Sequence, residues 1–185
     1  MLRQTFEREL QQLRDDVLAL GSMVEQAVVE SVETLRRRDL GGAQRLIDGD
    51  RAINQKRFSI EQNCLVVIAT QQPAAGDLRT LAAVLEIVTE LERIGDYAKG
   101  IARICLMLGD QPLVKPLVDI PRMSDKARDM LHRALEAFVN RDVALARAIP
   151  AGDDEVDTLY NQVYRELLDL IIANPRIIDG ATHLL

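Results

Sequence analysis

The chain has 185 residues, of which 48% are hydrophobic and 28% are charged, so it can bury a core and remain soluble. Aromatic residues make up only 3% and Trp is absent, which favours long helices over a β-sandwich. The formal net charge of −6 argues against non-specific binding to nucleic acid, because such binding uses a clustered basic face.

No segment has the pattern of a secretion signal or a membrane span. The first residues lack the apolar core of a signal peptide, and the longest mid-chain apolar run, 64–69, is far shorter than the ~20 residues that cross a bilayer. Cys64 and Cys105 lie in apolar helical stretches, as core residues of a reduced cytosol do. We expect a cytoplasmic protein that reaches the membrane only through partners.

Three long helices are predicted first. Apolar residues spaced three or four apart indicate an amphipathic helix over 3–38, and further helices are predicted over 42–71 and 77–108. Pro73 ends the second of these, and Asp77 is a candidate N-cap for the third. Helices of this length joined by short connections predict antiparallel neighbours in a bundle.

Three further helices are predicted after a break at Gly109. The first two cover 121–140 and 142–174, and the sixth begins near Asp179. Pro150 and Gly152 are expected to interrupt the first turns of the helix over 142–174, because proline lacks the backbone donor that a helix interior needs.

An internal duplication relates the two parts. Residues 37–54 align with 140–157 at an offset of 103, and a later segment aligns at an offset of 102. The identical or similar pairs are Arg38/Arg141, Asp39/Asp142, Gly49/Gly152, Asp50/Asp153, Ile53/Val156, Pro73/Pro175, Asp77/Asp179 and Thr80/Thr182.

We therefore expect an all-α fold of two tandem antiparallel three-helix bundles. The first covers 1–110, a connector covers 111–119, and the second covers 120–185. Continuing the repeat would place the counterparts of Glu92 and Asp96 past Leu185. The second bundle is thus expected to lack most of its last helix, as in a truncated chain.

The segment 89–101 carries the main functional signal. Glu92 and Asp96 lie one helical turn apart, and two such carboxylates repel each other by about 0.2–0.5 kcal/mol. Gly95 between them costs about 1 kcal/mol relative to Ala in a helix interior. A bound cation would offset both costs.

The predicted hairpin of the second and third helices brings more oxygen ligands to this segment. Counting back from a tight turn near 74–75 places Asp50 opposite position 99 and Asn54 opposite position 95. Carboxylate and amide oxygens in one patch suit Mg²⁺, Mn²⁺, Fe or Zn²⁺. The candidate metal ligands are Asp50, Asn54, Glu92 and Asp96, with Asp153 and Asp157 as the matching pair in the second half.

The alternative to a metal site is an ordinary acidic helix face that is exposed to solvent. Arg93 and Lys99 could neutralise these carboxylates as surface ion pairs, each contributing little to stability. The residues alone leave both interpretations open.

Several motifs together resemble the PhoU family of phosphate-uptake regulators. They are ELERIGDYAKGI, GDRAIN, QQPAAGDLR, GDDEVD and NPRIIDGATHLL, and they are distributed over most of the chain. The resemblance implies two similar three-helix bundles and a metal-binding motif in which an acidic residue precedes Asp by four positions. Glu92–Asp96 and Asp153–Asp157 match that motif, whereas Asp50–Asn54 departs from it in its second residue.

The resemblance also implies a regulatory role and no enzyme activity. It implies a cytoplasmic, metal-binding homodimer near the inner membrane face that restrains phosphate uptake and, indirectly, the transcription response to phosphate starvation. The implied partners are the ATPase subunit of the phosphate ABC transporter and a phosphate-sensing histidine kinase. The competing interpretation is a metal-independent helical adaptor; a carboxylate-bridged metalloenzyme would need paired Glu-x-x-His elements, which the sequence lacks.

Overall fold

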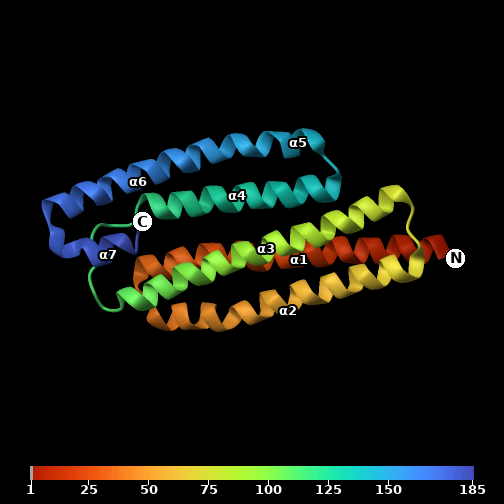
Figure 1. Cartoon of the computed structure of the whole chain (residues 1–185), viewed down its shortest axis with the longest axis horizontal. Helices are drawn as coiled ribbons and strands as arrows, with labels where there is room; N and C mark the ends of the chain where they lie inside the picture. The colour runs from red at the N-terminus through yellow and green to blue at the C-terminus, as the bar shows by residue number, and fades with distance from the viewer. Residues whose placement is uncertain (1) are drawn as a thin grey trace.

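The computed structural model describes residues 2–185, with side chains from Gln4 onward, and its described part is helical without strands (Figure 1). Three long helices come first: α1 (Leu2–Arg37), α2 (Leu40–Gln71) and α3 (Ala75–Leu108). The shorter elements that follow are α4 (Asp119–Asn140), α5 (Val143–Ala148), η1 (Ile149–Gly152), α6 (Asp153–Ala173), η2 (Pro175–Ile177) and α7 (Ile178–Thr182). The predicted all-α fold is confirmed.

The first three helices pack around a main apolar core and a second, smaller apolar cluster. Their mutual packing buries side chains that recur every three or four residues on each helix, which is why these segments are helical in the folded protein. Burying a Leu or Val side chain contributes about 1.5–3 kcal/mol before the entropy of ordering is subtracted. The largest fully buried side chains here include Val17, Leu20, Val24, Ile60, Leu81, Val84 and Val88.

The duplicated turns have the same local geometry in both halves. Arg38 and Arg141 each end a helix in the left-handed region, with φ of 56° and 53°. Asp39 then caps α2 by accepting a hydrogen bond from the Gly42 amide at 2.8 Å, and Asp142 caps α5 by accepting one from the Leu145 amide at 2.9 Å. The aligned Arg-Asp pairs therefore mark equivalent chain reversals.

The predicted interruption near Pro150 is confirmed. A 3-10 turn, η1, separates α5 from α6 and contains both Pro150 and Gly152. The sixth predicted helix begins one residue earlier than expected, at Ile178, and α7 extends only to Thr182.

The second part of the chain packs on the first through α4. Figure 1 shows α4 lying along the first three helices, with α6 on its far side. α4 contacts α1, and Leu135 of α4 is buried within the core of the first three helices. The two halves therefore share apolar contacts.

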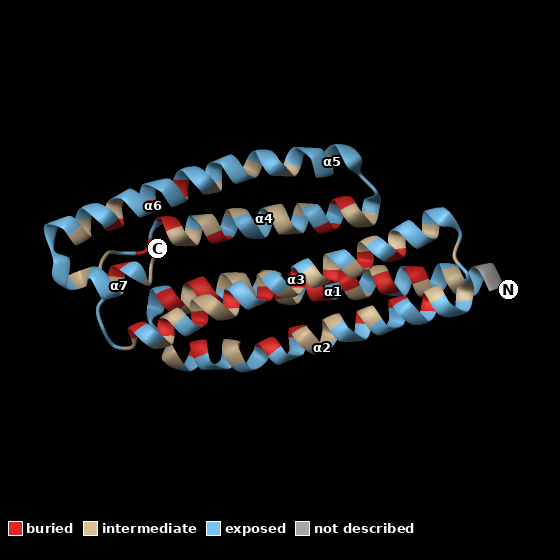
Figure 2. Ribbon diagram, viewed as in Figure 1, coloured by how far each residue is buried: buried red, intermediate tan, exposed pale blue. Residues whose placement is uncertain are grey.

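α6 has one covered and one open face. Leu159, Val163 and Leu167 are buried, whereas much of the remaining helix is exposed (Figure 2). The exposed side includes a stripe of large apolar residues: Tyr160, Tyr164, Leu168 and Ile172. In the described part of the chain, no helix is both long enough and apolar enough to cross a membrane.

Candidate functional site

The predicted register between α2 and α3 is confirmed. The Lys99 Nζ atom lies 2.5 Å from Asp50 Oδ2, so position 99 does face Asp50. Closer to the turn, the Cys64 thiol donates a hydrogen bond to the Leu81 carbonyl across the same pair of helices. α2 and α3 are therefore antiparallel neighbours along their length.

Gly95 has a packing role in this hairpin. It is buried, and a Cβ atom at this position would lie 3.3 Å from two side-chain atoms of Ile53. A Cβ atom here would require the Ile53 side chain to move by a few tenths of an ångström. The helix-propensity cost of Gly95, which the sequence suggested a cation would offset, thus has a steric explanation.

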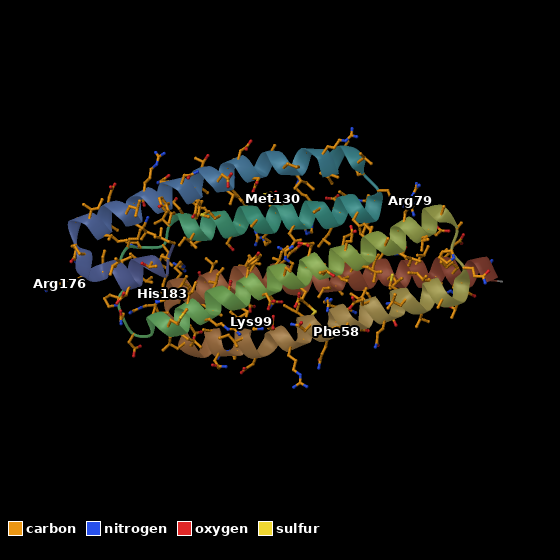
Figure 3. All side chains as sticks on the ribbon, in the orientation of Figure 1. Phe58, Arg79, Lys99, Met130, Arg176 and His183 are labelled. Atoms are coloured by element: carbon orange, nitrogen blue, oxygen red, sulfur yellow. The ribbon has the colours of Figure 1, made fainter. Side chains whose placement is uncertain are left out.

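Lys99 bridges the carboxylates that the sequence predicted would face each other. Its ammonium group lies 2.5 Å from Asp50 Oδ2 and 3.4 Å from Asp96 Oδ1 (Lys99 is labelled in Figure 3). The pKa of Lys99 is raised, chiefly by the hydrogen bond with Asp50. Asn54 adds a hydrogen bond from its amide Nδ2 to Asp50 Oδ2 at 3.1 Å. One lysine therefore joins Asp50 to Asp96, and Asn54 is attached to this bridge through its hydrogen bond to Asp50.

The Asp50 carboxylate is unusually placed for a charged group. Its side chain is only 7% exposed, whereas the Asp96 side chain is 52% exposed. Its second oxygen, Oδ1, is buried and accepts no hydrogen bond from the described residues. A buried acceptor without a donor costs about 1–3 kcal/mol.

The remaining candidate ligands stand apart from this bridge. Glu92 is half-buried one turn earlier in α3 and is joined to Asp50 or Asp96 by no hydrogen bond among residues 4–185. Asp153 and Asp157 are exposed in the first turns of α6. Arg93, the other predicted neutralising residue, pairs with Glu90 at 2.8 Å instead.

As placed, these residues do not fit a metal centre. Among the described residues, no three His, Cys, Asp or Glu side chains are grouped so that they could hold an ion. The Lys99 ammonium already supplies the positive charge between Asp50 and Asp96, so a metal ion would have to displace it. Metal binding by the six residues stays a prediction.

Sequence reasoning missed a cleft beside this bridge. It has a volume of about 720 Å³ and lies among the C-terminal half of α1, the N-terminal half of α2 and a short stretch of α3. Asp50 and Lys99 form part of its wall, together with Gly42, Gly49 and Gly95. Of these three glycines only Gly49 faces open space, whereas a Cβ atom would meet Asp39 at Gly42 and Ile53 at Gly95.

The matching chain reversals in the two halves indicate a helical-bundle protein built from two related units. Its third helix carries two acidic residues, Glu92 and Asp96, one turn apart. The sequence matches the PhoU domain family over residues 17–105 and 120–184. The chain therefore belongs to the PhoU family.

Individual relatives agree with this assignment. The chain is 36% identical to the phosphate-specific transport system accessory protein PhoU homolog of Aquifex aeolicus, covering 96% of this chain and 80% of that protein. It is 34% identical to the corresponding protein PhoU of Escherichia coli, covering 95% of this chain and 73% of that protein.

Solved structures show the same fold. A crystal structure of PhoU from Pseudomonas aeruginosa matches with a TM-score of 0.89 and 34% identity, over 96% of this chain and 86% of that one. The phosphate transport system regulatory protein PhoU from Streptococcus pneumoniae matches with a TM-score of 0.88 and 29% identity, over 97% and 84% of the two chains.

Proposed function

We propose that this protein is a regulatory accessory protein of a phosphate transport system. The observation that carries the proposal is the family match over both halves of the chain, together with relatives named as phosphate-specific transport system accessory proteins. In this proposal the protein acts by binding to other proteins and catalyses no reaction.

We further propose two protein partners and a direction of regulation. The protein binds the ATPase subunit of the phosphate ABC transporter and a phosphate-sensing histidine kinase. By doing so it restrains phosphate uptake and starvation signalling, and it influences transcription only indirectly. Its place is the cytoplasmic face of the inner membrane, which it reaches through these partners. The support is the shared fold and the ERIGD segment, in which Asp96 is exposed and available for contact.

The geometry around Lys99 favours the metal-independent form of this adaptor. The buried charge of Asp50 is already neutralised by the Lys99 ammonium, so α2 and α3 are held together without an ion. Removing one partner of a buried ion pair is strongly destabilising, because the other charge is left buried without compensation. In the complete pair, each charge is neutralised by the other and needs no added ion. We therefore propose that partner binding does not require metal.

A pull-down with both purified partners tests the function. We expect the full chain to retain the transporter ATPase subunit and the kinase equally well with EDTA and with added Mn²⁺. A variant carrying Asp96→Asn with Asp157→Asn alters exposed acidic positions in both halves, while Glu86→Gln alters an exposed carboxylate elsewhere on α3 and is the matched control. Retention of neither partner would overturn the proposal, and retention only with Mn²⁺ would overturn its metal-independent form.

The homodimer implied by the family resemblance is part of the same proposal. Light scattering after size exclusion measures it directly, because a dimer would have twice the 20.7 kDa of one chain. A mass of 20.7 kDa at every concentration tested would contradict it.

A further inference from the structure

The outer face of α6 carries a continuous apolar stripe. Tyr160, Tyr164, Leu168 and Ile172 follow one another at intervals of four residues, and all four are exposed, Ile172 at 78%. At 1.5 Å per residue they extend over about 18 Å of one helix face. Figure 1 shows α6 at the outer edge of the molecule, with α4 on its inner side. Single apolar residues on a surface are normal, whereas a continuous stripe marks an interaction site.

A row of charged side chains runs beside this stripe. Asp154, Arg165 and Asp169 are separated by 11 and 4 residues, so on a helix of 3.6 residues per turn they lie within about 60° of one another. Arg176 follows just past the end of α6 and is labelled in Figure 3. All four residues are exposed, and none of them forms an ion pair within residues 4–185. Their charges are therefore available to a partner.

The order of these charges is self-complementary. Along the chain it is negative, positive, negative, positive, and a second α6 running in the opposite direction presents the opposite signs. With a two-fold axis at position 166, the middle of the stripe, Arg165 comes within two positions of Asp169 of the second copy, and Asp154 within two positions of its Arg176. A parallel pairing would place each charge against its own copy, and like charges repel. The charges therefore favour an antiparallel second α6.

The apolar stripe fits the same two-fold axis. Tyr160 lies level with Ile172 of the second copy, and Tyr164 lies level with its Leu168, so each aromatic ring meets an aliphatic side chain. Tyrosine is enriched at protein interfaces because its ring is apolar while its hydroxyl can stay hydrated at the rim. One register thus aligns both the apolar residues and the opposite charges.

We propose that two copies of this chain associate through their α6 helices, packed antiparallel about this two-fold axis. The stripe forms the apolar centre of the interface, and the charged row forms its rim. Because the axis relates identical surfaces, each contact occurs twice. This inference deepens the homodimer proposed above and rests on it.

Variants in the stripe test whether this face is the interface. Light scattering after size exclusion, over a range of chain concentrations, measures the dimer. We expect Leu168→Glu to weaken association by at least about tenfold, because it buries an unpaired charge between the two helices. Leu65→Glu is the matched control, since Leu65 is an exposed leucine of α2 outside the stripe, and it should dimerise as the wild type does.

An exchange of two charges tests the antiparallel register. Arg165→Glu would face Asp169 of the second copy with a like charge, so we expect it to weaken association by about threefold to tenfold. The double variant Arg165→Glu with Asp169→Arg exchanges the two signs and restores opposite charges across the axis. Its association should therefore return close to that of the wild type.

Each contrary result has its own meaning. A dimer that is unchanged in Leu168→Glu would overturn this interface and leave the homodimer standing, and a double variant as weak as Arg165→Glu would overturn the register. A wild type of 20.7 kDa at every concentration would overturn the homodimer and this interface together.

The pull-down described above separates these outcomes from the accessory function. A monomeric wild type whose retention of the transporter ATPase subunit is lost in Leu168→Glu would assign the stripe to a partner protein and overturn the self-association. Circular dichroism verifies the folding of each variant. Ile172→Glu, at the most exposed position of the stripe, keeps the test decisive if Leu168→Glu does not fold.

Discussion

Gly21 of α1 lies directly against Leu135 of α4. A Cβ atom at Gly21 would be only 2.2 Å from Leu135 Cδ1, and Leu135 is 5% exposed within the core of the first three helices. This contact sets how closely the second half of the chain approaches the first.

Enlarging Gly21 should weaken that junction. We expect Gly21→Val to lower the free energy of unfolding by about 1–3 kcal/mol, because overpacking forces buried side chains from their preferred rotamers. Urea denaturation measures the change. Gly100→Val, at an open helical position, should have little effect, and adding Leu135→Ala to Gly21→Val should recover part of the loss. A Gly21→Val protein as stable as the wild type would contradict the steric role of this contact.

Removing Lys99 should expose the cost of a buried charge. We expect Lys99→Met to lower the free energy of unfolding by about 3 kcal/mol, because Asp50 would remain buried without its cation. The double variant Lys99→Met with Asp50→Asn should be less destabilised than Lys99→Met alone. Lys126→Met, which breaks the more exposed pair with Glu155, is expected to cost less than about 1 kcal/mol. Equal losses in the two lysine variants would show that burial of Asp50 has no energetic role.

Lys99 should also control metal binding. If its ammonium takes the position of a cation between Asp50 and Asp96, Lys99→Met should bind Mn²⁺ or Zn²⁺ more tightly than the wild type. Elemental analysis and calorimetric titration measure this difference. The triple variant that adds Asp50→Asn and Asp96→Asn should lose the gained affinity. Stoichiometric metal in the wild type and less in Lys99→Met would reverse this interpretation.

Glu33 should make stability depend on pH in the acidic range. Hydrogen bonds from the Arg36 guanidinium, at 2.7 Å, are the main cause that lowers the pKa of Glu33 from 4.5 to about 2. Since the folded-state pKa is the lower one, the stabilisation is present above pH 4.5 and is lost as the pH falls through about 2.

Unfolding experiments on Glu33→Gln at several pH values would show this effect. The difference in stability between wild type and variant should shrink as the pH is lowered from 4.5 to about 2. It should also be smaller at high salt, because Glu33 and its arginine partners lie at the surface. A difference that stays constant over this pH range would contradict the lowered pKa.

Local rules were sufficient to predict the helices and their pairing. Pro73 marks a short turn, and a short turn between two long helices leaves one register, which is why Asp50 could be placed opposite position 99. The prediction of Asp77 as the N-cap was wrong, because α3 begins at Ala75 with Ala74 as its N-cap, and Asp77 lies within the first turn. Pro150 likewise predicts the break before α6 from the chemistry of one residue.

Which side chains meet at the site depends on the packing of the helices, and the periodicity of apolar residues in the sequence does not encode that packing. A lysine side chain can extend to solvent or fold back, and only the packed helices show that Lys99 reaches Asp50. The cleft depends on how α1, α2 and α3 pack around Gly49, where a Cβ atom would meet nothing within 4 Å. The contact of Gly21 with α4 is equally non-local, because in the sequence Gly21 is only a weak helix former.

Arg38 does more than end α1. From its left-handed position, its Nη1 atom donates hydrogen bonds to the carbonyls of Asp110 and Gln111, at 2.9 and 3.0 Å. The residue at the first chain reversal is thus hydrogen-bonded to the segment that leads from the end of α3 into the second repeat. Because Arg37 and Asp39, the neighbours of Arg38, both line the cleft, the same two hydrogen bonds fasten the segment after α3 to the corner of α1 and α2 at one end of that cleft.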